Sequence, residues 1–144
     1  KVNFILNVWL KFFLLFFAQF NGSLENAFLQ NEAQQLVALL PSSAPVMISL
    51  PEPLSFSDCY SPDQARAVVD KIFNEARTQE FFIDQPNPLV CNERGAIISA
   101  RWSFVSENNS KKYVLRLYFF ISLEAPQKPG KIRALIKEIR AERQ

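Results

Sequence analysis

The chain has 144 residues, of which 16 are basic, 14 are acidic and none is histidine. Without histidine, mechanisms that pair a serine or cysteine nucleophile with an imidazole base are excluded, and two cysteines alone do not make a zinc site. The net charge of +2 comes from Lys1 and Lys11, because no acidic residue precedes Glu25. The remaining residues carry 14 charges of each sign, so charge gives no reason to expect a nucleic-acid partner.

Residues 1–20 have the composition of an export signal. Lys1 and Lys11 precede the seven-residue apolar run Phe12 to Ala18, and the small polar segment Asn21 to Ser23 follows it. This order predicts a signal peptide that is cleaved near Ala18–Gln19 or Phe20–Asn21, and therefore an exported protein that is periplasmic, secreted or membrane-anchored. Two alternatives stay open: an uncleaved membrane anchor, and a first helix that is buried in the domain.

The following residues, 21–144, are enough for one domain with its own core. Apolar residues in 24–40 have helical spacing, and Pro41 ends that predicted helix. The short apolar run 45–50 favours a strand, and 54–57 is a possible second leg of a hairpin with it.

A capped helix is predicted at residues 62–78. Ser61 can accept the N–H of Gln64, Pro62 fits the first helical position, and Gln64 can bond back to the Ser61 backbone. Apolar residues then recur at helical spacing from Ala65 to Ala76, which predicts one buried face.

From Glu80 onward the apolar period changes to two. Residues 81–84 read as a short strand, and 96–105 and 113–123 alternate on either side of the polar turn 107–111. This pattern predicts an antiparallel hairpin. Its second strand is apolar on both faces except at two positions, so we expect it to be central in the sheet.

The last segment has apolar residues at helical spacing, yet its end, 135–142, resembles the closing strand of a family of small exported bacterial domains. That family is domain of unknown function 4783, which is similar to the nuclear transport factor 2-like, cystatin-like superfamily. The resemblance covers residues 28 to 142 and follows the order of segments: a helix end at 36–40, a strand at 46–50, a capped helix start at 60–65 and a penultimate strand at 113–118.

The resemblance implies an α+β fold in which a curved antiparallel sheet wraps round a helix and leaves a cone-shaped hollow. It also implies that 132–141 is a strand, against the local helical spacing. The chain departs from the family pattern in a longer Pro86–Pro88 loop, in the insert Ala125 to Lys131 and in both of its cysteines, Cys59 and Cys91. These cysteines are predicted either to form a disulfide or to be free thiols.

Candidate binding residues lie on the two long strands. Arg101 and Arg116 could meet on one sheet face and bind a carboxylate or phosphate, or they could be exposed partners of glutamates. Tyr118 is a further candidate, and Trp102 is either a ligand contact or a core residue. No catalytic residue, metal ligand or cofactor site is predicted.

The sequence therefore predicts a non-enzymatic module that binds a small apolar ligand or a protein, with a homodimer through the sheet face as one form of the latter. A membrane contact is expected only through the N-terminal segment, as in a membrane-tethered interaction module. The enzymatic alternative is a small lyase or isomerase that uses Asp84 or Asp58 with Tyr118, which requires a carboxylate in an open apolar pocket.

Overall fold

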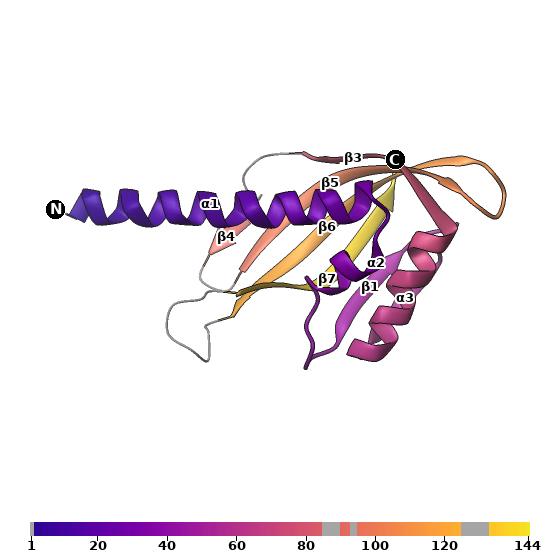
Figure 1. Ribbon diagram of the computed structural model, residues 1–144, viewed down its shortest axis with the longest axis horizontal. Coiled ribbons are helices and arrows are strands. Elements are labelled where there is room, and N and C mark those ends of the chain that lie inside the picture. Colours follow the sequence, from indigo (N-terminus) through magenta and orange to yellow (C-terminus); the bar gives the residue numbers. More distant parts are fainter. Residues whose placement is uncertain (1, 85–89, 93–94, 125–132) are drawn as a thin grey trace.

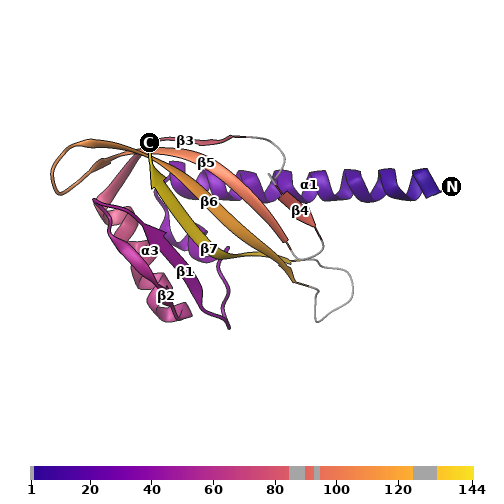
Figure 2. The ribbon, with the colours of Figure 1, turned by 180° about the vertical axis from the view of Figure 1, so that it is seen from behind.

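The computed structural model describes the backbone of residues 2–84, 90–92, 95–124 and 133–144, and the side chains of 15–84, 95–123 and 133–144. Within these ranges three helices pack with one mixed sheet that curves around them (Figures 1 and 2). The helices are α1 (Val2–Leu29), α2 (Ala33–Val37) and α3 (Pro62–Glu75). The strands are β1 (Val46–Leu50), β2 (Phe56–Tyr60), β3 (Ala76–Ile83), β4 (Val90–Asn92), β5 (Gly95–Ser106), β6 (Lys112–Glu124) and β7 (Arg133–Arg143).

The sheet has the strand order β2-β1-β7-β6-β5-β3, and β4 pairs with β5 beside this path. All pairs are antiparallel except β1 with β7. The hairpin predicted from residues 96–123 is confirmed as β5 and β6, and β6 is central as expected. The predicted strand at 46–50 is also confirmed, and its hairpin partner is β2, two residues later than expected.

The helix predicted at 62–78 is confirmed as α3, although it ends at Glu75 because the chain becomes strand β3 at the next residue. Ser61 and Gln64 form the predicted capping box, with each side chain accepting from the other residue's backbone N–H. The short strand predicted at 81–84 is the end of β3.

The single helix predicted at 24–40 is wrong. Its first part belongs to α1, which ends at Leu29, and its second part contains the separate helix α2. Asn31 lies between them with a φ of 55°. This left-handed conformation, which asparagine tolerates better than most residues, cannot continue a helix.

The closing segment is a strand, as the family resemblance implies and against its helical spacing. The register shifts between Phe120 and Ile121 of β6, because β7 contains one extra residue, Lys137, at this point. Next to this bulge, the N–H of Ile136 donates to the carbonyl oxygen of Leu39 at 2.8 Å. A bulge of this kind bends the strand and increases the twist of the sheet.

The α1 helix runs along the concave face of the sheet and projects beyond it at its N-terminal end (Figure 1). The boundary predicted at residue 20 therefore falls inside a continuous helix. No helix in the described part of the chain is both long and apolar enough to cross a membrane. The Pro86–Pro88 loop and the insert Ala125 to Lys131 lie outside the described residues.

Candidate functional site

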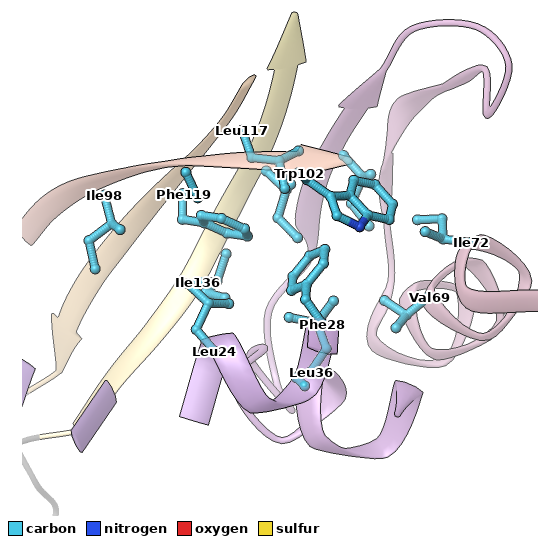
Figure 3. Packing of buried hydrophobic residues seen from close by; sticks show 14 of the residues in the cluster. Leu24, Phe28, Leu36, Val69, Ile72, Ile98, Trp102, Leu117, Phe119 and Ile136 are labelled. Atoms are coloured by element: carbon cyan, nitrogen blue, oxygen red, sulfur yellow. The ribbon is translucent and has the colours of Figure 1, made fainter. Parts of the chain in front are cut away.

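The concave face of the sheet, where the family resemblance implies a hollow, is filled by aromatic side chains. Phe28 projects from α1 toward the sheet (Figure 3) and is 2% exposed. Its ring stacks on Phe81 at a centroid distance of 4.5 Å and meets Trp102 edge-to-face at 5.1 Å. Phe73 and Phe119 contact the same ring at 5.2 and 5.9 Å. In the described part of the chain, these rings fill the space between α1, α3 and strands β3, β5 and β6.

A chain of hydrogen bonds satisfies the polar groups beside this aromatic cluster. Trp102 Nε1 donates to Thr78 Oγ1 at 2.9 Å, and Thr78 Oγ1 donates to Asn31 Oδ1 at 2.9 Å. The same Asn31 oxygen accepts from the Thr78 backbone N–H, and Asn31 Nδ2 donates to the carbonyl oxygen of Phe73. Each group has a protein partner, so the network holds α1 to α3 and the sheet and needs no ligand.

The opposite face of the sheet, which we call the outer face, is turned toward the viewer in Figure 2 and has α1 behind it. Met47 on β1 and Phe82 on β3 are 42% and 56% exposed. Half-buried Ile97 and Phe120 lie between them, and Arg140 sits 5.7 Å from the Phe120 ring centre. The outer face is thus a mixed surface with apolar side chains at both ends.

The arginines of the outer face are paired with acidic side chains. Arg101 and Arg116 are direct cross-strand neighbours in the β5–β6 ladder. Arg101 lies 3.8 Å from a carboxylate oxygen of Glu80, and both side chains are about half exposed. Arg116 donates to Asp84, which also accepts from the Ser99 hydroxyl at 2.8 Å.

The other nitrogens of the Arg116 guanidinium are also occupied. When the Gln144 amide is oriented with its oxygen toward Arg116, that oxygen accepts from both Nε and Nη2 at 2.9 Å. Each guanidinium nitrogen of Arg116 therefore donates to a partner within the chain. The geometry supports the structural alternative for these arginines, in which they partner acids, over a two-arginine anion site.

The four candidate binding residues do not come together. Trp102 lies on the concave face and is 1% exposed, whereas Arg101, Arg116 and Tyr118 lie on the outer face. Trp102 thus has the place of a core residue, which was its alternative. The other three share one surface, with Tyr118 opposite Ser99 in the ladder.

The two carboxylates of the enzymatic alternative are not in an apolar pocket. Asp58 is exposed on the edge strand β2, where its side chain accepts from the N–H of Cys59 at 2.7 Å. Asp84 is bound to Arg116 and Ser99 on the outer face. Asp84 therefore lies on the other face from the aromatic cluster, whereas Asp58 shares the face of its ladder partner Ile48 but is exposed at the sheet edge.

Cys59 is an exposed free thiol on β2, which agrees with the free-thiol alternative for this residue. The side chain of Cys91 lies outside the described residues, but its strand, β4, pairs with β5 and is separated from β2 by β1, β7, β6 and β5 in the sheet. Among the side chains that the structure describes, no group of three His, Cys, Asp or Glu residues could hold a metal ion.

Sequence reasoning missed the exposed apolar residues of the outer face and the partly buried hydrogen-bond network of Asn31, Thr78 and Trp102. Met47 lies within an apolar run, and its exposure becomes evident only from its alternation with the buried Val46 and Ile48. Asn31 and Thr78 are 47 positions apart and each looks like an ordinary turn or strand residue. Only the folded chain brings them together at Trp102.

Solved structures of other proteins share this architecture. No protein-family model and no curated protein matches the chain. Among solved structures, a domain of unknown function 4783 family protein from Bacteroides ovatus is 15% identical, with 85% of this chain and 93% of that chain covered and a TM-score of 0.55. A nuclear transport factor 2-like protein of unknown function in nutrient uptake from Rhodospirillum rubrum is 11% identical, with 88% and 97% covered and a TM-score of 0.61. A ketosteroid isomerase-like protein from Erwinia carotovora atroseptica is 10% identical, with 82% and 85% covered and a TM-score of 0.59. Identities this low show the fold alone, and this fold carries different functions in different proteins.

Proposed function

We propose that this nuclear transport factor 2-like domain is a non-enzymatic binding module that docks a protein on the outer face of its sheet, with a second copy of itself as the first partner to test. The observation that carries the proposal is the division between the two faces. The concave face is closed by packed aromatic rings, while the outer face leaves large apolar side chains in solvent.

The filled concave face argues against a small apolar ligand in the part of the hollow that the structure describes. Phe28 and its four ring neighbours lie at ordinary aromatic contact distances, from 4.5 to 5.9 Å. A ligand would have to displace at least one ring. Rings packed this closely do not move aside at low cost, because protein interiors have the density of organic crystals.

The same packing argues against a lyase or isomerase. Such an enzyme needs a carboxylate whose surroundings tune its acidity and an open site for the substrate. Asp84 is committed to Arg116 and Ser99, and Asp58 is solvated at a sheet edge. Likeness to the isomerase-like protein supplies the fold and none of this chemistry.

The outer face has the composition of a protein interface. Met47 lies on β1 and Phe82 on β3, with three strands between them. At a strand spacing of about 4.8 Å, β1 and β3 are about 19 Å apart across the sheet. Aromatic and arginine side chains such as Phe120, Tyr118 and Arg140 fill the space between. These residue types are enriched where proteins associate.

Sedimentation equilibrium of the full chain tests this function. We expect a reversible dimer, and we expect Phe82→Asp and Met47→Asp each to weaken it at least tenfold, because each buries a charge at the interface. The matched control is Leu29→Asp, since Leu29 is 49% exposed on α1, away from the outer face. A monomeric wild type at about 1 mM, or a dimer that neither outer-face variant weakens, would contradict the proposed self-association.

Export is also part of the proposal. It rests on the order of lysines, apolar residues and small polar residues in 1–23. Fractionation of cells that express the full chain tests it, and recovery of the chain entirely in the cytoplasm would contradict it.

A further inference from the structure

The N-terminal segment is built into the fold. The helix α1 passes without interruption through both predicted cleavage sites, and Phe17 and Phe20 on it are only 3% and 6% exposed. They belong to the same buried cluster as Leu24 and Phe28. Cleavage after Ala18 would remove one core phenylalanine, and cleavage after Phe20 would remove both. The folded domain therefore has a physical reason to keep this segment.

Just before Phe17, Phe16 is only partly buried against this cluster. In both views the N-terminal end of the helix extends beyond the sheet (Figures 1 and 2). Leu15 is 68% exposed. At 1.5 Å per residue, residues 2–16 form a projecting rod of about 22 Å.

The sequence of this rod is apolar, cationic and free of acids. Apolar residues at 2, 6, 9 and 13 continue, in steps of three or four, the face that Phe17, Phe20 and Leu24 occupy. Asn3, Asn7 and Lys11 are four residues apart and so form a polar stripe along the neighbouring side of the helix. No acidic residue occurs before Glu25. An apolar face beside a polar, basic row is typical of a helix that lies at a lipid–water interface.

We propose that α1 is retained in the mature protein and that residues 2–16 attach the folded domain to an anionic lipid surface. The charge of the segment complements anionic headgroups, since it contains Lys1 and Lys11 and no acidic residue. The attachment uses a different part of the molecule from the outer face, so either proposal can fail without the other.

The two tryptophans allow a direct test with the full chain and vesicles. Trp102→Phe leaves Trp9 as the only tryptophan, and Trp9→Phe leaves only the buried Trp102. With vesicles of phosphatidylglycerol and phosphatidylcholine, we expect the emission of Trp9 to shift to shorter wavelength and that of Trp102 to stay unchanged. If Trp102→Phe does not fold, the difference between wild type and Trp9→Phe gives the same signal.

Vesicle co-sedimentation adds a quantitative comparison. We expect Leu6→Asp to lower the lipid partition coefficient at least tenfold and Lys11→Glu to remove the preference for anionic over neutral vesicles. The matched control, Leu29→Asp, lies at the other end of the same helix on an exposed position and should bind vesicles like the wild type.

Three results would overturn the proposal. One is the absence of a Trp9 shift with anionic vesicles. Another is self-association in the absence of lipid that Leu6→Asp abolishes, which would assign the projecting segment to a second copy of the chain. The third is a mature product that begins at Gln19 or Asn21 when the full chain is expressed with its export machinery and its mass is measured.

Discussion

Phe28→Ala is the substitution that most directly probes the closed concave face. The ring is 2% exposed and contacts four other aromatic rings. Truncation of a buried phenylalanine to alanine costs about 3–5 kcal/mol, because it removes apolar contact and leaves a cavity. Each aromatic pair adds about 0.5–1.5 kcal/mol beyond its buried area, so we expect a loss in the upper part of that range, about 4–5 kcal/mol.

Urea unfolding at 25 °C, followed by circular dichroism, measures this loss. A typical domain has about 5–15 kcal/mol of stability, so the variant should still fold but with a much lower midpoint. Leu29→Ala is the matched control, because it truncates the adjacent, half-exposed residue of the same helix and should change stability by about 0.5 kcal/mol or less. A loss below about 1 kcal/mol for Phe28→Ala would show that the cluster is not tightly packed, and the account of the concave face would then be refuted.

Three further substitutions test other parts of the fold by the same unfolding assay. Thr78→Val should cost about 1–3 kcal/mol, because it leaves the buried Trp102 N–H without its acceptor; a neutral result would mean that the network contributes nothing. Ser61→Ala should cost about 0.5–2 kcal/mol through loss of the α3 cap, and an unchanged midpoint would contradict a functional capping box. Arg101→Ala should change stability by about 1 kcal/mol or less, because its pairing with Glu80 is long and exposed; a larger loss would give this ion pair a role that its geometry does not explain.

The closing strand shows how a local pattern misleads. The buried residues Ala134 and Ile136 are two apart, but the next buried residue on the same side is Ile139, three positions on. The bulge at Lys137 produces this step of three. In the sequence it looks like helical spacing, since a helix also repeats in steps of three and four. Only the family resemblance predicted the strand.

The local pattern also failed to predict the break between α1 and α2. The residues 24–40 have enough helix-favouring positions on both sides of Asn31 to suggest one helix. At the break, Asn31 hydrogen-bonds to Phe73 and Thr78, which lie more than 40 positions away and are invisible to a local pattern. Local patterns did predict the capped α3 and the β5–β6 hairpin, because those elements carry their own signals in adjacent residues.

The candidate site was predictable only in part. The structure places Arg101, Arg116 and Tyr118 on one face and Trp102 on the other, as the alternation of side chains along a strand requires. What alternation cannot give is which face the helices cover and which acids reach the arginines. Those depend on the order of strands in the sheet and on the position of Asp84 at the end of β3.

Calorimetry with a small apolar ligand tests most directly whether the concave face is closed. Benzene binds dry apolar cavities in protein cores, and a ligand that binds only the folded state raises the melting temperature. We predict that saturating benzene leaves the melting temperature of the wild type unchanged and raises that of Phe28→Ala, whose cavity it can enter. A rise for the wild type as large as that for the variant would contradict the account, because it would reveal an open apolar pocket where the structure has packed rings.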